Sequence, residues 1–148
     1  MKSRYGMEIR TAMAADAPGI AELLATGGLD IAPRSLADRL DAIRRDSGAA
    51  LIALEWGPPS GLVLIHWYRT LTADQPTAQI ATLFVGPDSR RRGIGRALLK
   101  AASQAARVAG CGALELRAHA DDSDLASFCR ATGFTETGHV FARPLRKG

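Results

Sequence analysis

Residues 80–99 read IATLFVGPDSRRRGIGRALL, and this stretch decides the fold. Its apolar run from Ile80 to Val85 is typical of a buried strand, which ends at Gly86-Pro87. A loop with three consecutive arginines, Arg90–Arg92, leads to Gly93-Ile94-Gly95 and a run of helix formers. Glycines let the backbone approach a ligand closely, and a helix start presents unpaired N–H groups and a positive dipole end. The stretch therefore predicts a polyphosphate site between a strand and a helix.

Two common phosphate-binding patterns do not fit this stretch. A P-loop requires Lys and then Ser or Thr after its second glycine, but Arg96-Ala97 follows Gly95. A dinucleotide fingerprint requires a third glycine where Leu98 stands, and it directly follows a strand. Glu115 lies at the offset of a ribose-binding acid, but it falls inside an apolar stretch, so we interpret that spacing as coincidence.

A third pattern fits: Arg90-x-x-Gly93-x-Gly95 resembles the [Gln/Arg]-x-x-Gly-x-[Gly/Ala] motif of the GCN5-related N-acetyltransferases (GNAT). It follows a V-x-P strand end and precedes Ala-Leu-Leu, as in that family. The resemblance covers nearly the whole chain. It extends to residues 7–24, which resemble the family's first strand and helix, to the Gly57–Gly61 hairpin turn, and to Phe128–Phe134, which resembles F-Y-x-x-x-G-F.

The resemblance implies one N-acetyltransferase domain over residues 1–148, with its core at about 7–145. The expected class is α/β (α+β), with a mixed, mostly antiparallel sheet of six to seven strands. About four helices would flank this sheet, which would splay between its fourth and fifth strands. The length of 148 residues suits one domain with a sizeable core.

Apolar periodicity, glycines and prolines place the individual elements. Asp16 is the expected cap of the first helix. The expected strands cover residues 7–13, 49–55, 61–68, 78–85, 113–118 and one or two segments within 135–145; the expected helices cover residues 16–25, 33–44, 95–108 and 124–131. The residues expected to face inward at and along the helix at 95–108 are Ile94, Leu98, Ala101, Ala105 and Val108.

The resemblance assigns the acetyl-CoA contacts by position. The backbone of Leu83, Phe84 and Val85 would pair with the pantetheine arm, and an N–H near Leu83 would polarise the thioester carbonyl. Asp122 stands where relatives commonly have an Asn that touches the pantetheine. The pyrophosphate would be held by the motif residue Arg90 and the loop Arg91, Arg92, Gly93, Ile94, Gly95 and Arg96.

The catalytic residues are less well defined by the sequence. Cys129 stands where relatives commonly have a Tyr that protonates the leaving thiolate. It is interpreted as a small buried residue in preference to a proton donor, and an acetyl-enzyme nucleophile is a further alternative. The strand at 78–85 lacks the family's usual acid. His119 and His66 are therefore the favoured candidates for a general base, beside Glu115, Asp121 and Asp122, unless the amine arrives already neutral.

The predicted activity is transfer of acetyl from acetyl-CoA to a primary amine of a small molecule by direct attack. A protein N-terminal or lysine acetyltransferase is one alternative, and a non-catalytic acyl-CoA-binding module is another. No metal is expected. The net charge is +4, but the few aromatics do not interleave with the basic residues, so no nucleic-acid partner is expected.

Location and assembly are predicted only in outline. No apolar run approaches the roughly 18 residues that span a bilayer, so no membrane partner is expected. The N-terminus shows no secretory leader, and Cys111 and Cys129 form no disulfide framework, so the expected location is cytoplasmic with both thiols reduced. Relatives are often dimers, which makes a homodimer an option.

Overall fold

The computed structural model describes residues 6–90 and 92–145. The chain divides into two compact units, one ending at Arg117 and one beginning at Ala118, and each is described here by itself. The expectation of a single domain over residues 1–148 stays a prediction.

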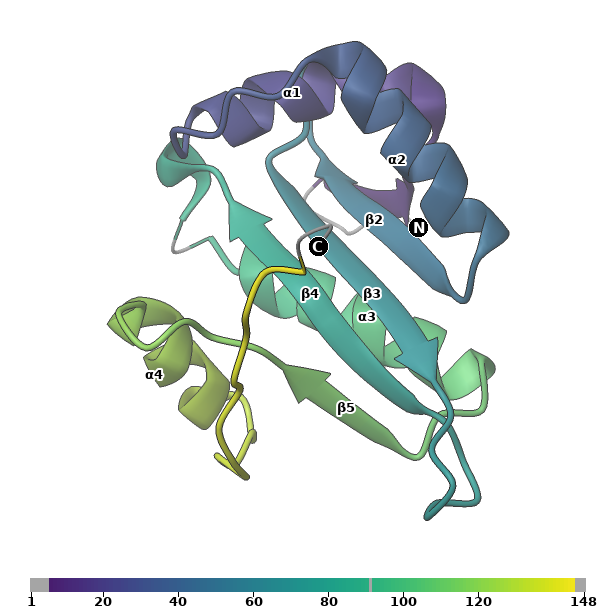
Figure 1. Ribbon diagram of the computed structural model, residues 1–148. Coiled ribbons are helices and arrows are strands. Elements are labelled where there is room, and N and C mark those ends of the chain that lie inside the picture. Colours follow the sequence, from purple (N-terminus) through teal and green to yellow (C-terminus); the bar gives the residue numbers. More distant parts are fainter. Residues whose placement is uncertain (1–5, 91, 146–148) are drawn as a thin grey trace. The chain divides into compact units, whose positions relative to one another are not determined.

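The first unit is built on one five-stranded sheet in the order β1-β2-β3-β4-β5 (Figure 1). Neighbouring strands are antiparallel except for β4 and β5, which are parallel. The strands are β1 Glu8–Thr11, β2 Gly48–Leu54, β3 Gly61–Tyr68, β4 Thr77–Val85 and β5 Ala113–Leu116; the helices of this unit are α1 Ala17–Ala25, α2 Pro33–Arg45 and α3 Ile94–Val108, with short 3-10 helices η1 Ala14–Asp16 and η2 Pro87–Ser89.

Helices cover both faces of the sheet, because each strand presents apolar side chains alternately to its two sides. α1 and α2 lie over one face and α3 lies over the other (Figure 1). Ile20, Leu40 and Ile52 belong to the core on the α1–α2 side. Ile65, Ile80 and Leu98 belong to the core on the α3 side, and each is at most 1% exposed. The mixed sheet between helices is the predicted class.

Two local expectations about helices are confirmed only in part. Asp16 is the N-cap residue of α1, but its side chain makes no capping hydrogen bond to that helix. Its carboxylate instead accepts two hydrogen bonds from Arg10, of 2.8 and 2.9 Å, and one of 2.8 Å from the N–H of Met13. Along α3 the buried stripe runs through Ile94, Leu98, Ala102 and Ala106, whereas Val108 is 79% exposed. The buried residues of α3 are thus spaced four apart, whereas the expected ones alternate between spacings of three and four. A row of residues spaced four apart forms the ridge along which α3 packs on the sheet.

The second unit contains α4 Ser123–Ala131, which brings the α-helices of the described residues to the predicted four. The expected strands within 135–145 are wrong, because the described residues of this unit form none, and the sheet has five strands rather than six or seven. A strand needs a neighbour for its N–H and C=O groups. The apolar residues of this segment are not packed either: Val140, Phe141 and Leu145 are 60%, 92% and 93% exposed.

The described residues contain no helix with the length and apolar character that a membrane crossing requires. Cys111 and Cys129 are both free thiols.

Candidate active site

One edge of β4 is left without a strand partner over its second half. On one side β4 pairs with β3 from Thr77 to Val85. On the other side it pairs with β5 only from Thr77 to Ile80, so residues 81–85 have no strand beside them among the described residues. The predicted splay between the fourth and fifth strands is therefore present.

The last three side chains of this unpaired stretch are turned into the two cores. Leu83 and Val85 pack against the core on the α3 side, and Phe84 packs against the core on the α1–α2 side. What remains along the edge is therefore backbone, whose N–H and C=O groups suit an extended polar ligand.

The chain leaves β4 through a short loop that leads directly into α3. The loop starts with Gly86, whose N–H donates to the Ser60 carbonyl at 2.9 Å, and continues through η2. It ends at Gly93, which has a φ of 79° and precedes the first residue of α3. Such a left-handed conformation favours glycine.

The first turn of α3 presents backbone donors at this point. Ala97 donates its N–H to the Gly93 carbonyl at 3.0 Å. The N–H groups of residues 94–96 come earlier in the turn than this bond, and in an α-helix such groups have no carbonyl of their own helix to bind. Ile94 is 2% exposed and fixes the start of the helix in the core. The helix start therefore presents backbone N–H groups without a partner in their own helix, and the anion site that the sequence indicates at this point stays a prediction.

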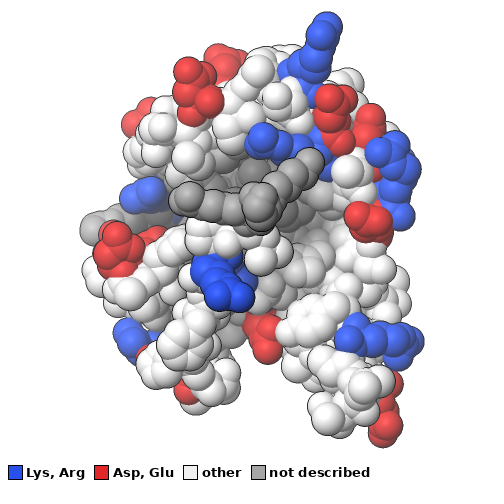
Figure 2. Space-filling view, viewed as in Figure 1, with Lys and Arg blue, Asp and Glu red and all other residues white. Residues whose placement is uncertain are grey.

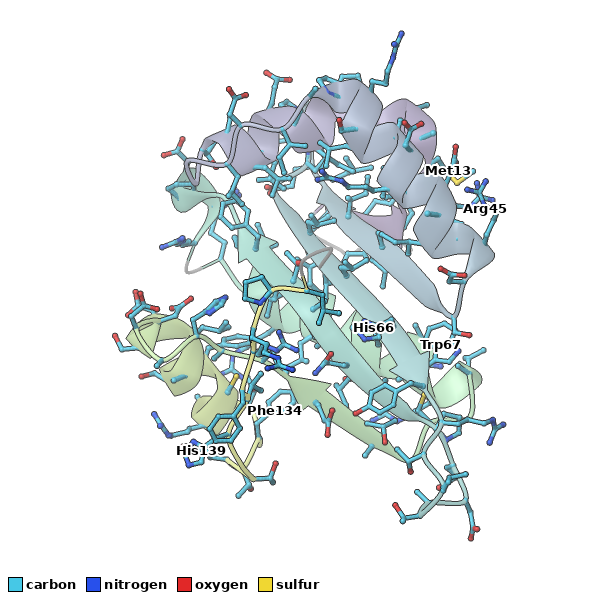
Figure 3. The ribbon with its side chains drawn as sticks, in the orientation of Figure 1. Met13, Arg45, His66, Trp67, Phe134 and His139 are labelled. Atoms are coloured by element: carbon cyan, nitrogen blue, oxygen red, sulfur yellow. The ribbon has the colours of Figure 1, made fainter. Side chains whose placement is uncertain are left out.

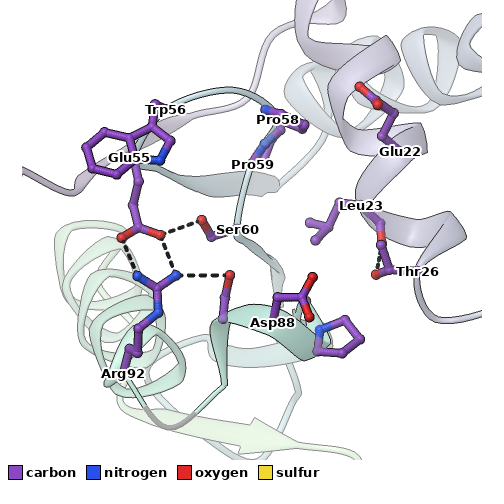
Figure 4. Close-up of a pocket in the computed structure, with 13 residues that line it drawn as sticks. Glu22, Leu23, Thr26, Glu55, Trp56, Pro58, Pro59, Ser60, Asp88 and Arg92 are labelled. Atoms are coloured by element: carbon purple, nitrogen blue, oxygen red, sulfur yellow. Dashed lines mark hydrogen bonds and ion pairs between the residues drawn. The ribbon is translucent and has the colours of Figure 1, made fainter.

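The arginines of the loop have different hydrogen-bond partners. Arg90 donates from Nε to the Val85 carbonyl at 3.4 Å. Arg92 donates from Nη1 and Nη2 to the two carboxylate oxygens of Glu55, at 2.8 Å each (Figure 4). Arg91 lies outside the described residues. Glu55 was not among the predicted site residues, because nothing in the sequence links it to a loop 37 residues later.

The Glu55–Arg92 pair stands at the rim of a surface pocket of about 330 Å³. Its wall comes from α1, from the turn between β2 and β3, and from η2 (Figure 4). The guanidinium beside Glu55, followed by the Ser60 hydroxyl, lowers the pKa of that carboxyl from its usual value. Glu55 is therefore an ionised carboxylate at neutral pH.

His66 lies near the end of β3 on the same strand face as Leu62 and Leu64 (Figure 3). It is half-buried and lines a second pocket, of about 200 Å³, together with the C-terminal side of α2. Its ring centroid is 6.4 Å from that of Tyr68, which donates a 2.8 Å hydrogen bond to Glu115 on β5. That bond raises the pKa of Tyr68. Two of the acid–base candidates, His66 and Glu115, thus lie on either side of one tyrosine.

The remaining predicted residues belong to the second unit. Asp122 is the N-cap of α4 and its carboxylate accepts from the Leu125 N–H at 3.0 Å, while its own N–H donates to the His119 carbonyl at 2.9 Å. Cys129 lies on α4 and is half-buried, and burial is the main cause that raises the pKa of its thiol. Asp122 therefore has a structural role, and Cys129 is protonated at neutral pH.

No group of three or more His, Cys, Asp or Glu among the described residues is placed to hold a metal ion. On the face in Figure 2, the described basic and acidic side chains are interspersed. A nucleic-acid surface would gather the basic ones.

Known proteins resemble this chain in sequence and in fold. The model of the acetyltransferase (GNAT) family matches residues 19–134. Mycothiol acetyltransferase of Propionibacterium freudenreichii subsp. shermanii is 28% identical over 110 residues, which are 64% of this chain and 35% of that protein. The chain thus spans about a third of the length of this curated relative.

Two solved structures share the fold at low sequence identity. Aminoglycoside N-acetyltransferase AAC(6')-Iy in complex with CoA has a TM-score of 0.82 and 21% identity, with 95% of each chain covered. Ribosomal-protein-alanine N-acetyltransferase of Brucella melitensis biovar Abortus 2308 has a TM-score of 0.80 and 21% identity, with 95% of this chain and 99% of that chain covered.

Proposed function

This chain belongs to the acetyltransferase (GNAT) family, and we propose that it is an acetyl-CoA-dependent N-acetyltransferase that acetylates a primary amine of a small molecule by direct attack. The observation that carries the proposal is the unpaired β4 edge at residues 81–85, which runs toward the start of α3. An extended thiol ester with a diphosphate at its far end matches this combination of a bare strand edge and an anion site.

The first unit supplies the proposed acetyl-CoA contacts. The pantetheine arm lies along the backbone of Leu83, Phe84 and Val85 as an additional strand. The diphosphate lies at the start of α3, where the N–H groups of Ile94, Gly95 and Arg96 meet it and the Arg96 side chain adds a charge. Close approach is favoured by Gly93 and Gly95, neither of which has a side chain.

The chemistry needs few side chains. The amine nitrogen attacks the thioester carbonyl carbon, the oxygen takes up negative charge, and the carbon–sulfur bond breaks to release the CoA thiolate. A backbone N–H near Leu83 stabilises the developing oxyanion, and the excess proton on nitrogen leaves to water or to a histidine. β4 carries no acid in its sequence, so the base is His119, His66 or the free-amine fraction of the substrate.

The small-molecule acceptor is supported by the names of relatives. They include a mycothiol acetyltransferase and an aminoglycoside N-acetyltransferase. A ribosomal-protein-alanine N-acetyltransferase is also among the solved structures, so a peptide N-terminus stays the second candidate acceptor. The hypothesis of a non-catalytic acyl-CoA-binding module is set aside, because the family is one of acetyltransferases.

The test measures thiol release from acetyl-CoA with a panel of amines. The panel contains alkylamines, polyamines, amino sugars, aminoglycosides and peptides with free N-termini or lysines. We expect release with at least one small amine and none without protein. Release with peptides alone would overturn the proposed acceptor, and release with none would overturn the proposed activity.

The base is tested by the pH profile of kcat/KM. A log–log slope near one that persists above pH 8 means that the substrate amine, with a pKa of about 10, governs the rate. A plateau that starts at about pH 6.5–7 means that a histidine governs it. His119→Ala should then lower the plateau more than His66→Ala, and a plateau unchanged in both variants would exclude both residues.

A further inference from the structure

The loop between β4 and α3 is fastened to the β2–β3 turn at both of its ends. At its start, the Gly86 N–H donates to the Ser60 carbonyl at 2.9 Å. At its end, the Arg92 guanidinium forms the two 2.8 Å bonds to Glu55 (Figure 4). Arg92 directly precedes Gly93, so the second attachment acts on the backbone immediately before the start of α3.

The residues on the turn side are themselves held in place. Glu55 directly follows β2, and its Oε1 also accepts from the Ser60 hydroxyl at 2.8 Å. The Ser60 N–H donates to the Ala53 carbonyl at 2.8 Å, which continues the pairing of β2 with β3. The Glu55 side chain is only 20% exposed, against 50% for Arg92. A carboxylate fixed in this way can orient a flexible arginine, because the bidentate geometry allows one direction of approach.

The pair also reduces the N–H donors and the net charge that Arg92 has available for a phosphate. Both Arg92 Nη atoms donate to the carboxylate, and Nη2 donates in addition to the Ser89 hydroxyl at 3.2 Å. The charge of Arg92 is therefore largely balanced by Glu55. Arg96 lies one turn further, in the first turn of α3, and is exposed.

We propose that Glu55 is a positioning residue for acetyl-CoA: through Arg92 it sets the direction in which the loop enters α3, which keeps the first N–H groups of that helix aimed at the diphosphate. This inference rests on the proposed function. Glu55 acts through Arg92 in this arrangement, and Arg92 does not bind the phosphate with its own charge. In the opposite arrangement Glu55 competes with phosphate for Arg92. Removal of the Glu55 charge would then tighten CoA binding, whereas our proposal predicts weaker binding.

The experiment measures the Kd of CoA by calorimetry at several salt concentrations. The variants are Glu55→Gln, Arg92→Gln, their double variant, and Arg96→Gln. Glu22→Gln is the matched control, because Glu22 lines the same pocket on α1 and lies away from Arg92 (Figure 4). Thermal unfolding of every variant shows whether it is folded, and Glu55→Asp keeps the charge on a shorter side chain.

Glu55→Gln and Arg92→Gln should each raise the Kd of CoA by about five- to tenfold, the scale of an exposed charge-assisted pair that orders a loop. The double variant should be no worse than either single variant, because both remove the same contact. Both single variants should keep the wild-type salt dependence, whereas Arg96→Gln should weaken it. In turnover, the KM for acetyl-CoA should rise in both while kcat and the KM for the amine stay unchanged. Glu55→Asp should be intermediate, and Glu22→Gln should match wild type.

Three results would overturn the inference. Tighter or unchanged binding in Glu55→Gln would mean competition or no role. Additive losses in the double variant, or a weakened salt dependence in Arg92→Gln, would mean that Arg92 meets the phosphate itself. A wild-type protein that fails to bind CoA would overturn the proposed function together with this inference, whereas binding that is unaffected in the variants would overturn the inference alone.

Discussion

Gly93→Ala tests whether the left-handed turn before α3 is needed for CoA binding. Gly93 has a φ of 79°, and apart from its two chain neighbours no atom of the described residues lies within 4 Å of the point where a Cβ would stand. Alanine therefore meets no steric obstacle, and its cost is that of the backbone conformation alone. For an L-residue in this region that cost is about 1–2 kcal/mol.

Gly110→Ala is a matched control at the other end of α3. Gly110 has a φ of 86° and likewise nothing within 4 Å of a Cβ position. Its turn is held by N–H bonds of 3.0 Å from Gly110 to Arg107 and from Cys111 to Ala106. Because the turn is held, the strain stays in the folded state, and the melting temperature should fall by roughly 2–8 °C. The Kd of CoA should stay at the wild-type value.

In Gly93→Ala the same backbone strain should weaken CoA binding more than it lowers the free energy of unfolding. The Arg92–Glu55 pair that precedes Gly93 is partly exposed and worth about 0–1 kcal/mol, less than this strain, so the loop can relax in the free protein. The lost conformation then has to be restored when CoA binds. Restoring about 1–2 kcal/mol raises the Kd by roughly five- to thirtyfold. The loss of unfolding free energy should be smaller than for Gly110→Ala. Calorimetry with CoA and urea unfolding measure the two quantities. A wild-type Kd in Gly93→Ala, with a stability loss equal to that of Gly110→Ala, would refute the reasoning.

Three further outcomes are expected. Leu98→Ala, at a side chain that is 0% exposed, should lower the free energy of unfolding by about 2–5 kcal/mol in urea titrations, whereas Leu71→Ala, fully exposed, should change it by less than about 0.5 kcal/mol. The hydrogen bond from Arg10 lowers the pKa of Asp16 below its ordinary value of 3.8. The stability advantage of wild type over Asp16→Asn should therefore be constant well above that pH and shrink as the pH falls through the folded pKa. An advantage that does not shrink on acidification would contradict this. Because burial keeps the thiol of Cys129 protonated, acetyl-CoA alone should leave no acetyl group on it in intact-mass measurements, and an adduct that an amine releases would show a covalent route.

Much of the fold follows from local pattern. The segment 61–68 was predicted as a strand with the bounds that the structure has, because Gly61 begins a mostly apolar run and polar residues follow it. The start and end of α3 follow from glycines on both sides of a run of helix formers. The segment 135–145 was predicted wrongly as strand. Whether an extended segment becomes a strand depends on a partner distant in sequence, and local pattern contains no such information.

The absence of a side-chain cap from Asp16 has a related cause. An acid before a helix predicts a cap when only neighbours along the chain are considered. Here Arg10 on the preceding strand supplies a guanidinium, and a charge-assisted bidentate pair is stronger than a single bond to a backbone N–H. The carboxylate therefore turns to Arg10 and Met13.

The run of three arginines shows how far charge in a sequence differs from charge available at a site. The sequence indicates three cations beside the anion-binding helix start. Glu55 balances Arg92, and Arg90 donates to the carbonyl of Val85 at the end of β4, although weakly at 3.4 Å. The attraction for a diphosphate then depends more on the backbone N–H groups of α3, whose direction is set by how the loop enters the helix. An uncharged change that redirects the loop, such as Gly93→Ala, should therefore weaken CoA binding at least as much as removal of the Arg92 charge.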